Sequence, residues 1–170
     1  MTENEVNEEE LELEDYREDK EKIVIQTHER ISQDLCGEVI EFKQGYVELR
    51  LTTSPEMVAD DMGLIHGGFI FSAADYAAML AVNERNVVLV ASDCQFLSPV
   101  KLHDEIHFTA SICHKEGRNR NVYVEGFVLD IKIFKGEFKT VITKRNVLKL
   151  KLLDKEESES GTPVSTEGNS

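Results

Sequence analysis

The spacing of apolar positions predicts a short helix and a hairpin near the start of the chain. Between residues 22 and 35 the apolar positions fit one face of an amphipathic helix, which Gly37 ends. Residues 37–42 and 46–51 then alternate between apolar and polar on either side of Lys43-Gln44-Gly45. This alternation around a turn that contains glycine is typical of two antiparallel strands.

A longer helix and four further strands account for the rest of the pattern. Residues 68–82 are mostly apolar and rich in alanine, which predicts one long buried helix. Four runs rich in β-branched and aromatic residues follow, at 86–97, 105–114, 121–134 and 137–150. They are separated by Ser98-Pro99, Glu116-Gly117-Arg118 and Lys135-Gly136. Successive strands are therefore expected to be antiparallel neighbours, in an α+β domain whose sheet wraps around the long helix.

Charge divides the chain of 170 residues into one domain and two ends. The formal net charge is −14, of which residues 1–22 carry −8 and residues 151–170 carry −3. Such charge-rich ends bury too little apolar surface to offset the entropy of an ordered chain, so we expect both to be disordered. A partner-binding acidic arm is the less favoured alternative. The folded domain is expected at residues 23–150.

The cysteines and the lack of long apolar stretches indicate the cellular compartment that we expect for this protein. Cys36, Cys94 and Cys113 are an odd number and have no CxxC or Cys/His spacing, so we expect a reduced, cytoplasmic protein without disulfides or a bound metal. There is no apolar signal stretch at the N-terminus and no segment with the apolar length of a membrane span. We therefore expect no membrane insertion. The acidic ends would repel DNA or RNA, so nucleic acid is not an expected partner.

Candidate chemistry gathers where the long helix begins. His66, Gly67 and Gly68 form a turn of small residues that leaves the first helical N–H groups free to donate to a carbonyl or phosphate oxygen. Asp75 is the one acid in the helix and lies seven residues after Gly68, about 10 Å further along the axis. One helix cannot present both groups to one carbonyl carbon. If they act together, a second copy supplies the acid, which predicts a homodimer, or a dimer of such dimers, with shared sites.

Three stretches carry a resemblance to a known family: residues 63–75, 91–101 and 104–110. They resemble the hot-dog-fold acyl-CoA thioesterases of the phenylacetate-pathway type, and the resemblance covers roughly residues 35–150. In that family His-Gly-Gly opens the central helix, and an Asp nine residues after the His is the general base or nucleophile. The resemblance implies a hot-dog fold and an acyl-CoA substrate, with no other cofactor. It also implies that Asp75, Gly67 and Gly68 are catalytic.

Substrate-binding residues are predicted on both sides of this motif. Asp60, His66, Phe96 and Ser98 lie in or beside the matching stretches, and His66 is expected to cap the turn rather than to act in catalysis. The phosphates of coenzyme A would need cations. Arg118 and Arg120, at a predicted hairpin tip, are the first candidates, ahead of Lys101, Lys144 and Arg145. An ordinary solvated turn is an equal alternative for this tip.

Two positions depart from the family's pattern. Asp60 stands where these thioesterases commonly have an Asn that helps to position the thioester or the water. Ungapped alignment places Leu89 or Ala91 where a Ser or Thr often supports that water. Residues 91–101 also resemble the malonyl-CoA-sensing hot-dog regulators, but the acidic N-terminus does not fit their helix-turn-helix. An acyl-CoA thioesterase is the favoured prediction, and a non-catalytic acyl-CoA-binding protein with a sensing or regulatory role is the alternative.

Overall fold

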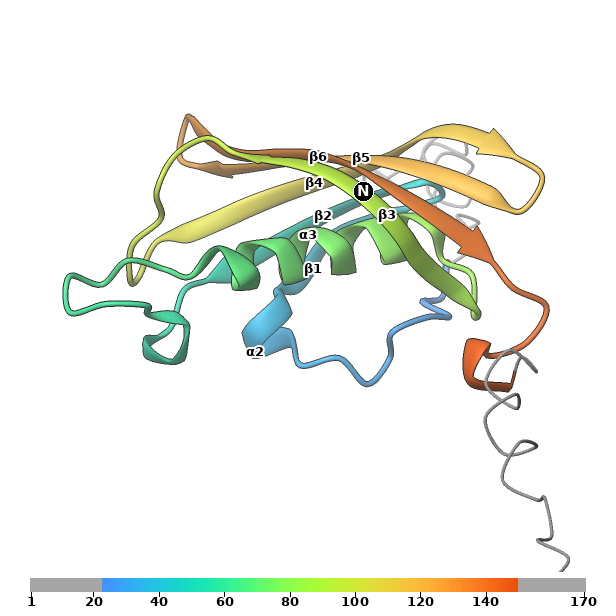
Figure 1. Cartoon of the computed structure of the whole chain (residues 1–170), viewed down its shortest axis with the longest axis horizontal. Coiled ribbons are helices and arrows are strands. Elements are labelled where there is room, and N and C mark those ends of the chain that lie inside the picture. Colours follow the sequence, from blue (N-terminus) through green and yellow to red (C-terminus); the bar gives the residue numbers. More distant parts are fainter. Residues whose placement is uncertain (1–22, 150–170) are drawn as a thin grey trace, which may run out of the picture.

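The chain folds into a six-stranded antiparallel sheet that wraps around one long helix (Figure 1). The computed structural model describes residues 23–149. The strands are β1 (Glu38–Lys43), β2 (Tyr46–Thr52), β3 (Val87–Phe96), β4 (Glu105–Glu116), β5 (Asn119–Val128) and β6 (Ile131–Ile142). The helices are α2 (Gln33–Cys36) and α3 (Gly67–Val82), with 3-10 turns at Pro55–Met57 and Val147–Lys149. The predicted α+β architecture is confirmed, whereas the disorder predicted for 1–22 and 151–170 concerns residues outside the described part.

Helix α3 lies close against the inner face of the sheet because its buried side consists largely of small residues. Five of them are alanines: Ala73, Ala74, Ala77, Ala78 and Ala81. Facing them, Phe108 of β4 and Phe134 and Phe138 of β6 are fully buried and fill the space that the alanines leave. Helix α3 has 16 residues, and no helix among residues 23–149 is long and apolar enough to cross a membrane.

The helix predicted over residues 22–35 is wrong for most of its length. Only α2 is helical, and residues 23–32 form an irregular strap beneath α3, with a turn closed by the N–H of Ile31 and the carbonyl of His28 (Figure 1). Asn83, at the end of α3, holds this strap with both ends of its side-chain amide. Its Oδ1 accepts from the N–H of Gln26 at 2.8 Å, and its Nδ2 donates to the carbonyl of Val24 at 3.0 Å. Tertiary hydrogen bonds thus replace those that a helix would have made. The predicted end at Gly37 is confirmed, with φ +95°.

The sheet order is β1-β2-β4-β5-β6-β3, which corrects two sequence-based expectations. Strand β3 does not pair with β4, the next strand along the chain, but with β6. The chain also turns between β5 and β6 at Leu129-Asp130, with Leu129 at φ +50°, and not at Lys135-Gly136. The hairpin at Gln44-Gly45 and the turn at Gly117-Arg118 are confirmed.

Gly136 is a packing glycine in the middle of β6. It lies opposite Cys94 in the β3–β6 ladder. A Cβ atom at this position would lie 2.8 Å from the Sγ of Cys94 and 3.1 Å from the carbonyl oxygen of Asp93. Only glycine therefore lets the two strands keep their spacing while the Cys94 side chain lies over β6.

Candidate active site

The start of α3 presents two free backbone donors. His66 is the N-cap residue, and its carbonyl accepts from the N–H of Phe69 at 3.1 Å. Within residues 23–149, the N–H groups of Gly67 and Gly68 have no hydrogen-bond acceptor, because no side chain caps this helix. The positive end of the helix dipole adds to their attraction for an oxygen that carries negative charge. This confirms that the predicted turn opens a helix with donors available.

The imidazole of His66 lies beside these donors without capping them. A Cβ atom at Gly68 would be 2.9 Å from the Nε2 of His66, so the absence of a side chain at Gly68 makes room for the ring. The ring is exposed and meets Phe69 edge to face, with centroids 6.2 Å apart. His66 thus borders the donor site, while its predicted capping role belongs to its backbone alone.

An apolar pocket opens next to Gly67. Its volume is about 290 Å³, and apart from Gly67 and Ser98 its lining is made of apolar side chains: Ile65, Ile70, Phe96, Leu97, Pro99 and Val100. Phe96 forms the wall nearest the helix, because a Cβ atom at Gly67 would lie 3.4 Å from its ring. The structure therefore brings together three of the predicted residues, Gly67, Phe96 and Ser98.

Asp75 lies two turns further along α3 and is half-buried. Its Oδ1 is the one buried side-chain oxygen or nitrogen in residues 23–149 that lacks a hydrogen-bond partner. Burial raises the pKa of Asp75 from 3.8 to about 6. Burial is the main reason that the pKa of the Cys94 thiol is raised, and the charges of Asp93 and Asp75 contribute less. Cys94 therefore lies within electrostatic range of Asp75. An unpaired carboxylate in such a place is the usual mark of a functional acid rather than of a structural one.

Sequence reasoning missed the hydroxyl that faces this helix from β3. A bulge between Leu89 and Ala91 shifts the alternation of inward and outward side chains. After the bulge, Ser92 and Phe96 pair with the buried Phe138 and Phe134, so Ser92 shares the inner face of the sheet with them. Counting alternate positions back from Phe96, rather than aligning without gaps, would have found Ser92.

Asp60 organises the loop that precedes α3. Its Oδ1 accepts from the N–H of Met62 at 2.9 Å and from the N–H of Leu64 at 3.0 Å. Gly63 completes this loop with φ +83°. One oxygen of the Asp60 side chain thus holds the loop that leads into the helix. This role needs only an acceptor, so it requires no side-chain donor at this position.

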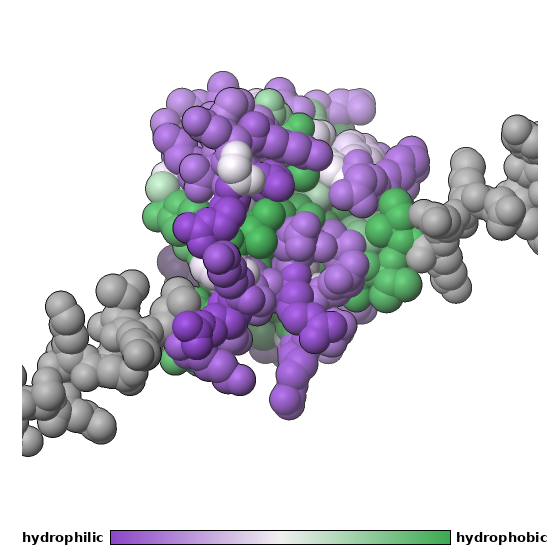
Figure 2. All heavy atoms as spheres, turned by 90° about the vertical axis from the view of Figure 1, so that its right-hand side faces the viewer, coloured by the Kyte–Doolittle hydropathy of each residue, from purple (hydrophilic) through white to green (hydrophobic). Residues whose placement is uncertain are grey.

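Arg118 and Arg120 lie at the tip of β4 and β5, at the opposite end of the sheet from the start of α3 (Figure 1). Arg120 donates to the carbonyls of Gly117 and Asn119, both at 2.8 Å. The end of the molecule that carries this tip is covered mainly by hydrophilic side chains (Figure 2). One chain therefore does not bring these arginines to Gly67. Lys101 is nearer to the pocket, because it follows Val100 of the lining and forms a backbone β-bridge with Leu64.

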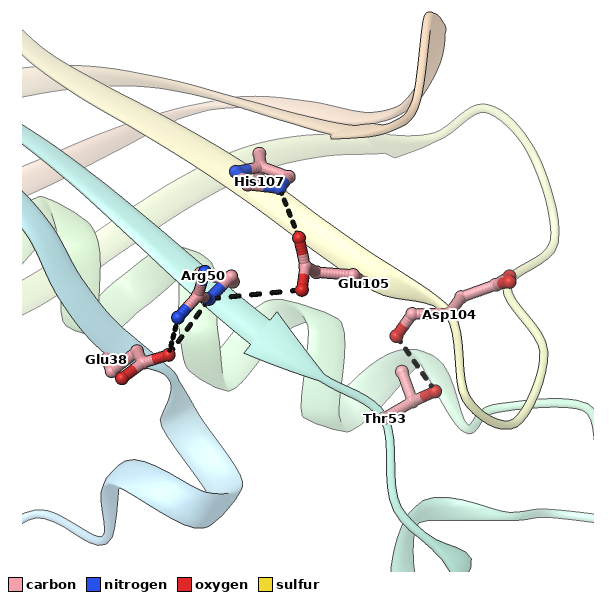
Figure 3. Close-up of polar contacts among 6 residues, drawn as sticks. All are labelled: Glu38, Arg50, Thr53, Asp104, Glu105 and His107. Carbon is pink, nitrogen blue, oxygen red and sulfur yellow. Dashed lines mark hydrogen bonds and ion pairs between the residues drawn. The ribbon is translucent and has the colours of Figure 1, made fainter.

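A second polar cluster lies on the face of the sheet turned away from α3 (Figure 3). The Nε of Arg50 donates to Glu38 at 2.9 Å and lies 3.9 Å from Glu105, which in turn contacts His107 at 2.7 Å. A polar pocket of about 440 Å³ beside it is lined by Arg50 and three acids, Asp34, Glu38 and Glu56. These side chains are partly exposed to solvent, so their ion pairs are weak. We therefore place the candidate site at α3. Residues 23–149 contain no group of three or more His, Cys, Asp or Glu side chains that could hold a metal ion.

Comparison with known proteins identifies the family. Residues 62–134 match the thioesterase superfamily model. Over 121 residues the chain is 31% identical to the acyl-coenzyme A thioesterase PaaI of Escherichia coli (strain K12), a match that covers 67% of this chain and 81% of that protein. This chain belongs to the thioesterase superfamily. The α+β sheet around α3 is accordingly the hot-dog fold of that superfamily, as the sequence motif implied.

Other relatives carry different names, and this chain covers different shares of their length. It is 51% identical over 117 residues to methylthioribose-1-phosphate isomerase of Aquifex aeolicus (strain VF5), covering 69% of this chain but only 26%, about a quarter, of that protein. It is 25% identical over 114 residues to transcription factor FapR of Staphylococcus aureus, covering 66% of this chain and 62% of that one. The crystal structure of PH1136 from Pyrococcus horikoshii superposes with a TM-score of 0.73 at 40% identity, covering 74% of this chain and 97% of the other.

Proposed function

We propose that this protein hydrolyses acyl-CoA thioesters. The observation that carries the proposal is the unpaired Oδ1 of Asp75, on the same helix whose first N–H groups are free and adjoin an apolar pocket. These are the three things that thioester hydrolysis needs: a base, donors for the oxyanion and room for the acyl group. The identity to the acyl-coenzyme A thioesterase PaaI supports the same reaction.

The reaction follows from the positions of these groups. The thioester carbonyl oxygen accepts from the N–H groups of Gly67 and Gly68, which stabilise the negative charge that develops on it. Asp75 removes a proton from a water molecule while the water oxygen bonds to the carbonyl carbon. The carbon–sulfur bond then breaks, and the proton passes to the coenzyme A sulfur, which gives a free acid and a free thiol. A base with a pKa of about 6 is ionised at neutral pH, and its pKa is still close to that pH, which favours general-base catalysis.

Two copies of the chain are needed to complete this site. Gly68 and Asp75 lie on one helix about 10 Å apart along its axis, so one carbonyl carbon cannot meet both from the same chain. Strand β3 ends the sheet, and Val90 and Phe96 on it are 58% and 53% exposed. An open edge with apolar side chains favours pairing with another copy. We therefore propose that Asp75 of one subunit acts at the Gly67-Gly68 donors of the other, in a dimer or a dimer of dimers.

Light scattering on the full chain tests this assembly. We expect a mass of twice the 19.3 kDa of one chain, or a higher even multiple of it, at micromolar concentration. Mixing an inactive Asp75→Asn chain with an inactive Gly68→Val chain should restore activity in the hybrid dimers, since each hybrid keeps one intact site. A monomer that hydrolyses acyl-CoA would contradict the shared site.

The phosphates of coenzyme A need cations, and the dimer offers two sources. Lys101 adjoins the pocket in the same chain. Arg118 and Arg120 are far from the pocket of their own chain, so in our proposal they contact coenzyme A bound to the other subunit.

Hydrolysis and binding should be measured side by side to test the proposed reaction. Purified wild-type protein is expected to release free thiol from acyl-CoA well above the uncatalysed rate, alongside saturable binding in calorimetry. Saturable binding without thiol release would favour the alternative of an acyl-CoA sensor, which the similarity to FapR supports. Neither binding nor release for any acyl-CoA would contradict both proposals.

A further inference from the structure

The pocket beside Gly67 differs in polarity from most of a coenzyme A thioester. The pantetheine arm contains amides and the nucleotide end carries phosphates, and both would need polar partners once buried. The pocket offers one side-chain hydroxyl, that of Ser98, among six apolar side chains. Its lining therefore fits the acyl end of the molecule and not the coenzyme A end.

Among residues 23–149, no charged side chain lines this pocket. Lys101 follows Val100 in the chain, but its side chain is exposed and is not part of the lining. An acyl group that ends in a carboxylate, such as malonyl, would have to place its charge against apolar side chains and lose part of its hydration without an ionic partner, which is unfavourable. The pocket thus discriminates by charge as well as by polarity.

The volume limits the length of an acyl chain. A pocket of about 290 Å³ is at the small end for sites that bind small molecules. It is open to solvent on one side, so only the first part of a long acyl chain would be held against its walls.

Phe96 is the largest side chain that lines this pocket. Its ring lies against Gly67 and meets Phe134 edge to face, with centroids 5.3 Å apart. Phe134 is fully buried and fixes the ring from behind. Loss of the Phe96 ring would therefore extend the pocket along the inner face of β3 without removing either backbone donor.

We propose that this pocket selects short, uncharged, apolar acyl groups and that Phe96 limits their length. The inference rests on the proposed thioesterase function, because it takes the Gly67-Gly68 donors as the place of the carbonyl oxygen. It adds the class of acyl group and the residue that determines it.

The test compares acyl-CoAs of different length and charge on the full-length protein. Wild type is expected to hydrolyse hexanoyl-CoA with a kcat/KM at least about tenfold above those for palmitoyl-CoA and malonyl-CoA. In Phe96→Ala the ratio of dodecanoyl-CoA to hexanoyl-CoA should rise at least about tenfold, since room for even one further methylene is worth a factor of this order. Tyr123→Ala is the matched control: it removes an aromatic ring, 40% exposed, from the outer face of β5, and the ratio should not change.

Binding of non-hydrolysable thioether analogues separates this inference from the proposed reaction. If wild type binds the hexanoyl analogue more tightly than the palmitoyl and malonyl analogues but hydrolyses no thioester, the pocket assignment stands and the hydrolase proposal fails. If hydrolysis is rapid but indifferent to chain length and charge, or if Phe96→Ala behaves like Tyr123→Ala, the pocket assignment is overturned and the hydrolase proposal stands.

Discussion

Asp75→Asn is expected to lower kcat/KM for acyl-CoA hydrolysis by about 100-fold or more while leaving the Kd for thioether analogues nearly unchanged. The amide keeps the shape of the side chain but cannot take a proton from water. Asp93→Asn is the matched control, because Asp93 is an exposed carboxylate of β3 that pairs with Glu137 and alternates with the inward Ser92. Steady-state thiol release checks both variants, and undiminished hydrolysis by Asp75→Asn would overturn the mechanism.

The pH dependence of the wild type follows from the same carboxyl group. Because the pKa of Asp75 in the folded protein is about 6, the base is lost to protonation as the pH falls through that value. The kcat/KM should therefore decrease about tenfold for each pH unit below 6. A profile that stays flat between pH 7 and pH 5 would show that Asp75 is not the base.

The folded protein should also be less stable when Asp75 is ionised. Burial raises its pKa to about 6 from 3.8, so between these values the folded state binds more protons than the unfolded state. The contribution of Asp75 to stability is then greatest below pH 4 and is lost as the pH rises through 6, by up to about 3 kcal/mol. Urea denaturation should find Asp75→Asn more stable than wild type at pH 8, with a smaller difference at pH 4.

Gly136→Ala is expected to lower the free energy of unfolding by about 1–3 kcal/mol, because the new methyl group would overlap Cys94 and the carbonyl oxygen of Asp93. The clash with the backbone oxygen, at 3.1 Å, requires β3 and β6 to move apart. Lys139→Ala, at an exposed position of the same strand, is the control and should change stability by less than about 0.5 kcal/mol.

A double variant shows which contact matters. In Gly136→Ala/Cys94→Ala the sulfur is gone while the backbone oxygen remains, so part of the lost stability should return, by about 0.5 kcal/mol or more beyond additivity. Urea denaturation of wild type, Gly136→Ala, Cys94→Ala and the double variant measures this difference. If Gly136→Ala were as stable as wild type, Gly136 would be a tolerant strand position and the close approach of the strands would be refuted.

Local pattern was enough to predict the elements on which the site is built. The alanine-rich helix, its opening at Gly67 and the hairpin around Gly45 all depend on neighbouring residues, and each was found where expected. The six strands were also counted correctly. The motif from His66 to Asp75, together with the stretches at 91–101 and 104–110, was enough to indicate the family, which the comparisons confirmed.

Features set by distant residues were beyond the reach of the pattern. The strap at residues 23–32 is held at Val24 and Gln26 by Asn83, which is more than 50 positions away. Gly136 has the signature of a turn, since glycine marks both turns and close packing, and only the neighbouring Cys94 shows which applies. The sheet order depends on the pairing of β3 with β6, which no local signal encodes.

That pairing also sets the order in which the molecule can be completed. Within residues 23–149, β3 pairs with β6 alone, and the ladder joins residues 38 positions apart at Phe96 and Phe134 and 55 apart at Val87 and Ile142. Contacts between such distant residues form late, because a long loop must close before they contribute. On the ribosome, Asp75 and Phe96 emerge well before Phe134, so the pocket wall has no support until β6 has been synthesised. The part of the chain that carries the chemistry is thus translated early but gains its support only after β6 has been made.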